Sequence, residues 1–268
     1  MTSSLLNQFR GVLSGMAITD WSTQQPDNCR PATRSACPIT IALVSMPELL
    51  LLYQHPAKAE ALLQHLQAVE PTMAKKTLIP CWMVSEVLDL SIQGQLGLNQ
   101  GLKPLYQRFD PIGILAAEMQ ALELNWRPPL LCIEAACQQP RSLSSVQTQL
   151  QPLTQPQLQP FWLALYILLS TPDDYRLALA RTQAVSQDRA LTAALVGAWL
   201  GGKIGKPGLP LVWQLFDFTD QEADEKDERL IALIEIQQLA ERLFAQWSGI
   251  DPAYIDRSDR LLPAIAIP

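Results

Sequence analysis

The residues with the clearest chemical pattern lie between Gln187 and Gly201, where an acid precedes a run of small side chains. Asp188 stands in the first turn of a predicted helix, where the helix dipole favours a negative charge by roughly 0.3–1 kcal/mol. Small residues (Ala190, Ala193, Ala194, Gly197, Ala198 and Gly201) cover one side of that helix. Such a face packs against neighbouring helices at close range, so this segment is expected at the centre of a tight helical domain.

A second candidate is the acidic stretch Asp217–Glu228, which contains seven carboxylates. It lacks the glycine and the ligand spacing of a calcium loop. A solvated helix start explains the stretch without any function. A docking surface for a basic partner is the alternative.

A third candidate is a nucleophile paired with a histidine, and the chain has two histidines, His55 and His65. Either could meet Cys37 or Cys81 in space, although no spacing argues for it, and no Gly-x-Ser-x-Gly or phosphate-binding glycine motif occurs. The five cysteines form no CxxC, so they are expected to be reduced and mostly buried. No zinc site is expected.

Composition narrows the classes of partner. The formal net charge of the 268 residues is −6, and no basic run is longer than Lys75–Lys76. A mildly acidic chain has no field that attracts nucleic acid or anionic lipid. The apolar runs are too short to cross a membrane, and no signal peptide is visible. We therefore expect a cytoplasmic protein that binds neither nucleic acid nor membranes.

Helical spacing of apolar residues predicts an all-α fold, arranged as one compact multi-helix domain over residues 1–268. Gly11 and Gly15 lie on one face of the first helix and would let another helix approach closely. Helices are expected over 3–18, 39–53 with a break at Pro47, a stretch after Pro56, 82–90, 110–124, 130–137, 145–150, 161–169, 171–184, 187–200 and a long segment after 219–222.

Signals for helix ends and connections complete this prediction. Thr171 and Pro172 should begin one helix, and Gly201-Gly202 should end another. Residues 21–40 are expected to form a long polar loop. The Gln- and Pro-rich residues 138–160 are expected to connect helices, either inside one domain or at a domain boundary.

Together these residues resemble the ADP-ribosylglycohydrolase family, best over about 160–215 and more weakly over 1–55. That family carries two aspartates one residue apart, a Thr or Ser, an Ala- and Gly-rich helix, a Gly-rich turn and a Pro-then-Trp element. Asp188 falls on the first aspartate, and the matching later parts are Ala193-Ala194, Gly197-Ala198, Gly201–Gly205, Pro210 and Trp213. Pro172-Asp173-Asp174-Tyr175 is similar to the approach to this motif, and Gly11, Gly15 and Asp20 are similar to the first helix.

The resemblance implies a two-magnesium site built from aspartates on several helices, and this chain departs from it. The position of the second aspartate is Ala190, and that of the following Thr is Leu191. The segment Ser35–Thr40 holds no carboxylate where the family has Thr-Asp-Asp. Because two close magnesium ions need several oxygen ligands, a single aspartate cannot hold the pair.

Three hypotheses follow. The first is a family member that has lost dimetal catalysis and binds a protein partner, ADP-ribose or another nucleotide. Asp188 and Asp20 would then be the remains of the motif, and Cys37, Thr40 and Arg189 would line the cleft; no metal or cofactor is expected. The second is an active magnesium-dependent hydrolase of ADP-ribose linkages, with carboxylates recruited from Asp20, Asp110, Asp173 or Asp174. The third is an unrelated helical interaction protein.

Overall fold

The computed structural model describes residues 5–23, 40, 42–43, 45–55, 57–69, 74–96, 102–110, 114–139, 141–185, 188–210 and 223–249. Every regular element in these ranges is a helix, which confirms the predicted all-α class. The elements are α1 (Leu5–Thr23), α3 (Met46–Leu51), α4 (Lys58–Val69), α5 (Ala74–Ile92), α6 (Lys103–Arg108), α7 (Ile114–Ala121), α8 (Arg127–Gln138), α9 (Leu143–Leu150), η3 (Gln151–Leu153), η4 (Pro156–Leu158), α10 (Gln159–Ser170), α11 (Tyr175–Thr182), α12 (Arg189–Ile204), η5 (Lys206–Gly208) and α14 (Ala223–Ser248).

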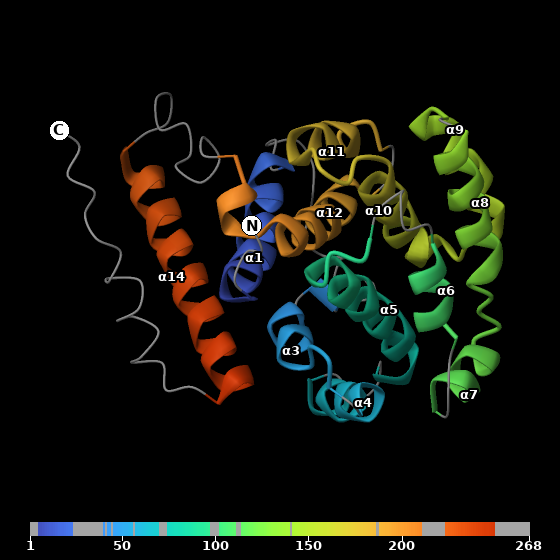
Figure 1. Ribbon diagram of the computed structural model, residues 1–268, viewed down its shortest axis with the longest axis horizontal. Coiled ribbons are helices and arrows are strands. Elements are labelled where there is room, and N and C mark those ends of the chain that lie inside the picture. Colours follow the sequence, from blue (N-terminus) through green and yellow to red (C-terminus); the bar gives the residue numbers. More distant parts are fainter. Residues whose placement is uncertain are drawn as a thin grey trace.

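Helices α1 and α12 lie at the middle of the molecule (Figure 1). Helix α12 also contacts α5, α10 and α11, while α14 lies along one side and α8 and α9 form the opposite edge. Buried apolar side chains from Phe9 to Leu243 form one cluster. Among the helices described, none has the length and hydropathy needed to cross a bilayer.

Close contact between α1 and α12 depends on glycine. A Cβ atom built on Gly11 would collide with the carbonyl oxygen of Gly201, and one built on Gly15 would collide with that of Gly197. The two backbones therefore touch with no side chain between them. The pairing of Gly11 with Gly201 and of Gly15 with Gly197 makes the helices antiparallel. This arrangement confirms the prediction that the small faces of both helices permit close approach.

Two prolines lie at informative places. Pro47 was expected to break a helix over 39–53, and it stands in the first turn of α3, which begins directly after the turn residue Ser45, so its missing N–H costs nothing there. The helix expected over 82–90 is longer than predicted, because α5 begins at Ala74 and contains Pro80. Residues 77–92 of α5 are all buried. Packing on all sides therefore offsets the backbone hydrogen bond that Pro80 removes.

The ends of α11 and α12 also correct the prediction. Helix α11 is capped by Asp174, whose Oδ1 accepts from the Leu177 N–H at 2.9 Å, and not by Thr171. Helix α12 runs through Gly201-Gly202 and ends at Gly205, whose φ of 68° is one that glycine adopts without strain. Here the two glycines serve the contact with α1 and do not terminate the helix.

The Gln- and Pro-rich segment 138–160 packs one side against the core and exposes the rest. Ser142 caps α9 by accepting from the Ser145 N–H at 3.3 Å, so this helix begins slightly before the predicted 145–150. Leu143 and Leu150 are buried in the common cluster, and the Tyr166 hydroxyl donates to the Arg141 carbonyl at 2.9 Å. These contacts favour an internal connection over a domain boundary.

Other predicted segments differ in extent. Helix α1 continues to Thr23, so the predicted loop 21–40 begins at least three residues too early, and residues 24–39 lie outside the described ranges. Helix α6 was not predicted. The start of the helix predicted over 110–124 cannot be followed, because residues 111–113 are not described. Residues 219–222, before the long predicted helix, likewise lie outside the described ranges. One domain over 1–268 stays a prediction.

The long C-terminal helix is confirmed as α14. Arg10 of α1 pairs with Glu241 at 2.6 Å, and the Trp247 indole N–H donates to the Tyr53 carbonyl at 3.1 Å. Phe9 packs edge-on against Phe244, with ring centroids 5.8 Å apart. These contacts fasten α14 to α1 and to the residue that follows α3.

Candidate functional site

The register of α1 against α12 decides where the two remaining motif aspartates lie. Beyond Gly15, α1 runs on toward Asp20, while from Gly197 the partner helix runs back toward Asp188. Because the helices are antiparallel, both aspartate positions lie at the same end of the pair. The side chain of Asp20 is outside the described set, so its backbone alone is placed.

Asp188 is the N-cap residue of α12 and not a first-turn acid as predicted. Its backbone is left-handed, with φ 48° and ψ 39°, a conformation that Asp tolerates better than most side chains. The carboxylate makes no capping hydrogen bond and is exposed. The Asp188 carbonyl, in contrast, accepts from Thr192 N at 3.0 Å and from Thr192 Oγ1 at 3.2 Å. The carboxylate is therefore presented to solvent at the helix end.

The positions beside Asp188 carry no further metal ligand. Ala190 and Leu191 are half-buried, and Leu191 packs against the core. Arg189 is exposed in the first turn. Thr40 is helical, and its hydroxyl is buried without a hydrogen-bond partner among the described residues. Cys37 lies outside the described residues, so its predicted place in the cleft is not tested.

The other proposed carboxylates are engaged elsewhere. Asp173 accepts from Lys203 Nζ at 3.0 Å, near the opposite end of α12 from Asp188. Asp174 caps α11. Asp110 lies 3.8 Å from Arg127 on an exposed surface. Each of these three aspartates has another partner, and their recruitment beside Asp188, one possibility under the hydrolase hypothesis, stays a prediction.

A two-magnesium centre does not fit the donor set that the described residues supply. No group of three or more His, Cys, Asp or Glu side chains in the described ranges is arranged to hold a metal ion. A magnesium pair needs several such oxygens in near-octahedral arrays.

A buried ionic network between α4, α5 and α6 was missed by the sequence analysis. The Lys58 ammonium donates to Asp89 and lies 3.3 Å from Glu86, which also faces Arg108 Nη1 at 3.3 Å. The strained residue Gln54, with φ 56°, donates its backbone N–H to Asp89 at 3.4 Å. Burial raises the pKa of Asp89, and the Lys58 charge opposes that rise.

One sequence signal could have revealed this network. Glu86 and Asp89 interrupt an otherwise apolar helix three residues apart, so they share one face. Two acids on a buried helix require cations nearby. The network ties three helices together through buried side chains, so we interpret it as structural.

The nucleophile hypothesis finds no support in the described residues. Cys81 is 0% exposed, and burial raises the pKa of its thiol to about 12. His55 accepts from the Ala57 N–H at 3.2 Å in an exposed turn. His65 Nε2 lies 4.0 Å from Glu48. Among the described residues, neither histidine forms a hydrogen bond with Cys81, and Cys37 lies outside those residues.

The glycine contact between α1 and α12 leaves the backbone positions of Asp20 and Asp188 at one end of the helix pair. The family model described as ADP-ribosylglycohydrolase matches residues 2–252. The chain therefore belongs to the ADP-ribosylglycohydrolase family, and the hypothesis of an unrelated helical protein is wrong. No curated protein matches the chain. The family match covers far more than the segment 160–215 in which the resemblance was clearest.

Proposed function

We propose that this family member has lost dimetal catalysis and acts as a cytoplasmic binding or assembly protein. The observation that supports the proposal concerns the residues that follow Asp188 at the start of α12. There the motif's second aspartate and its Thr are replaced by Ala190 and Leu191, which pack as half-buried apolar residues. If the active site was lost, α12 would be retained for its packing role while the metal-ligating side chains at its start were replaced.

The second candidate is an active, magnesium-dependent hydrolase of ADP-ribose linkages. One observation favours it: the antiparallel register places the Asp20 position at the same end as Asp188. Two aspartates there could contribute to a metal site if further oxygens came from residues that are not described. Fold membership alone does not establish the activity.

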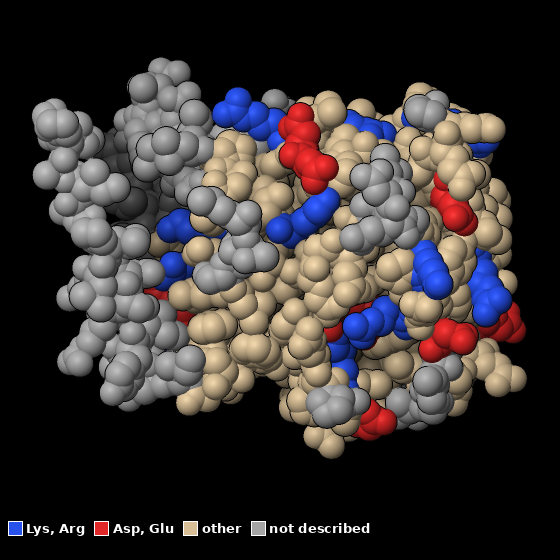
Figure 2. Space-filling view, in the orientation of Figure 1, with Lys and Arg blue, Asp and Glu red and all other residues tan. Residues whose placement is uncertain are grey.

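The distribution of charged side chains favours a partner that is recognised by its shape and not by long-range electrostatic attraction. On the face shown in Figure 2, acidic and basic side chains are scattered among uncharged ones, with no continuous patch of either sign over the coloured residues. With a net charge of −6, the chain is not expected to attract polyanions. The proposed partner is therefore a protein, with ADP-ribose or a nucleotide as a second ligand of the old cleft.

Calorimetric titration with ADP-ribose, with and without magnesium, separates the two candidates. We expect the heat of binding, whether zero or measurable, to be unchanged by magnesium, because one exposed carboxylate cannot hold the pair of ions. The matched control is Asp188→Asn, since Asn also tolerates the left-handed backbone. Binding that magnesium strengthens, and that Asp188→Asn abolishes, would instead support the hydrolase.

A further inference from the structure

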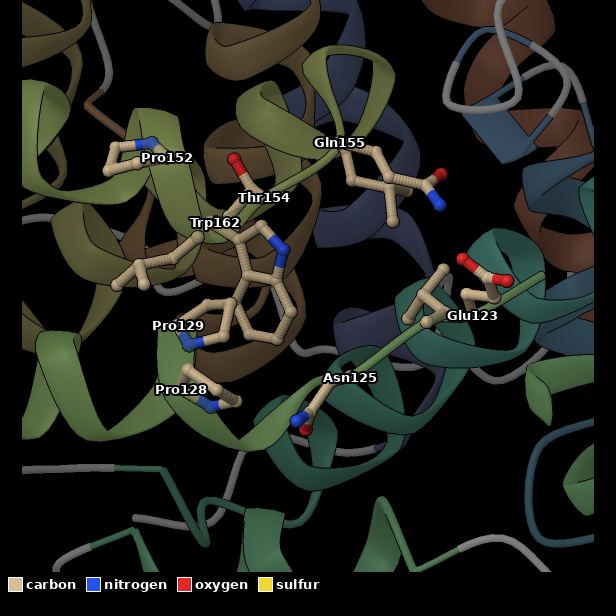
Figure 3. Close-up of a pocket in the computed structure, with 11 residues that line it drawn as sticks. Glu123, Asn125, Pro128, Pro129, Pro152, Thr154, Gln155 and Trp162 are labelled. Carbon is tan, nitrogen blue, oxygen red and sulfur yellow. The ribbon is translucent and has the colours of Figure 1, made fainter.

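A pocket of about 260 Å³ opens between the α7–α8 connection and the η3–η4 segment (Figure 3). The rings of Pro128, Pro129 and Pro152 form part of its apolar wall, and Trp162 of α10 lies among them. None of the lining residues comes from α1, α11 or α12. The pocket is therefore a separate feature from the aspartate end of those helices.

Packing contacts and a hydrogen bond hold the walls of the pocket in place. Trp162 is 1% exposed, and its ring meets Phe161 edge-on at 5.0 Å and Phe109 edge-on at 6.4 Å. The Gln155 side chain donates to the Leu122 carbonyl at 3.2 Å and so ties the two walls together. A preformed site avoids much of the entropic cost of ordering side chains on binding.

Two hydrogen-bond donors are available to a ligand. In Figure 3 the indole nitrogen of Trp162 points toward the space between Gln155, Glu123 and Asn125. It has no hydrogen-bond partner among the described residues, whereas a buried Trp N–H usually has one. Asn125 Oδ1 accepts from the Arg127 N–H at 3.2 Å, which leaves the amino group of its side chain for a ligand. Both groups require acceptor oxygens.

The rim adds a negative charge. Glu123 stands in the turn after α7 with a left-handed φ of 50°, and its exposed carboxylate lies beside the pocket (Figure 3). No described cation pairs with it. This carboxylate attracts a basic group and repels a phosphate. The pocket thus favours a ligand with apolar rings, free carbonyl oxygens and a positive charge.

We infer that the pocket binds an extended, proline-containing peptide segment of the partner protein, with a Lys or Arg beside the proline. An extended polyproline helix has no internal hydrogen bonds, so its carbonyls are free to accept from Trp162 and Asn125. The inference rests on the proposed binding function and names the chemistry of the partner.

Fluorescence anisotropy with a labelled peptide of prolines and one arginine tests the inference on the full chain. We expect binding that Trp162→Phe weakens about tenfold, since this change deletes the N–H but keeps an aromatic ring. Glu123→Gln should weaken the arginine peptide several-fold and leave a peptide with glutamine in place of arginine unaffected. The matched control is Leu177→Ala, an exposed apolar residue on α11, which should bind as the parent does.

Three results would overturn the inference: no peptide binding, equal binding by Trp162→Phe, or binding of a free nucleoside at this pocket in place of the peptide. Glu123 is exposed, so the Glu123→Gln variant is expected to fold and still tests the inference if Trp162→Phe does not fold. Loss of peptide binding alone would leave the proposed function standing, because the titration with ADP-ribose and magnesium addresses a different end of the molecule.

Discussion

Gly201→Ala is expected to lower the free energy of unfolding by about 3 kcal/mol. The new Cβ would meet the carbonyl oxygen of Gly11, which is backbone and cannot rotate away. The helices α1 and α12 would have to separate along their whole contact, because both are rigid. This cost exceeds the gain of roughly 1 kcal/mol that alanine brings to a helix interior. Urea or thermal unfolding of the purified variant measures the difference.

Gly202→Ala is the matched control because it carries the same gain in helix propensity at the neighbouring position. Its Cβ would lie 3.0 Å from Val12 Cγ2 and 3.2 Å from Ile92 Cγ1, which are side-chain atoms that can shift. We expect a change of less than about 1 kcal/mol. Equal destabilisation by the two variants would contradict the backbone contact at Gly201.

Lys58→Met should have the second large effect, lowering the free energy of unfolding by about 3–5 kcal/mol at neutral pH. The substitution keeps an unbranched side chain, one atom shorter, and removes the charge that Asp89 and Glu86 face. Asp89 is 1% exposed, so water cannot replace the ammonium. Equilibrium unfolding in denaturant measures the loss.

The pH dependence of that loss has a defined sign. Burial already raises the pKa of Asp89, and removal of Lys58 raises it further. A carboxyl group with a raised folded-state pKa destabilises the fold above that pKa and is harmless when protonated in both states. The loss in Lys58→Met should therefore shrink as the pH falls. The control Lys203→Met removes a pair with Asp173, which is 86% exposed, and should cost less than about 1 kcal/mol.

The helical class and the central contact could be predicted from the sequence because their signals are local. Gly11 and Gly15 are four residues apart, as are Gly197 and Gly201, so each pair falls on one helix face. A helix face made of small side chains allows a close contact with another helix, and this prediction does not depend on the remaining sequence.

The end of α12, the continuity of α5 and the ionic network depend on tertiary packing. Gly201-Gly202 would terminate an isolated helix, but α1 lies against them and the helix continues. Pro80 would break an exposed helix, but α5 is buried on all sides. Lys58 meets Asp89 across 31 residues of chain, which no local pattern predicts.

The candidate site was predictable in part. Asp188 and Asp20 were identified through the family pattern, and the register of α1 against α12 places both positions at one end. The conformation of Asp188 could not be predicted, because a left-handed cap depends on how the preceding turn enters the helix. The recruitment of Asp110, Asp173 or Asp174 stays a prediction, although each has a partner of its own in the described structure.

The loss of dimetal catalysis is tested most directly by turnover. The full chain would be incubated with magnesium and an ADP-ribosylated arginine substrate, and released ADP-ribose would be quantified against a reaction without protein. We predict release at the uncatalysed rate, unchanged by magnesium and by Asp188→Asn. Magnesium-dependent release that Asp188→Asn abolishes would contradict the proposal and establish this chain as an active hydrolase.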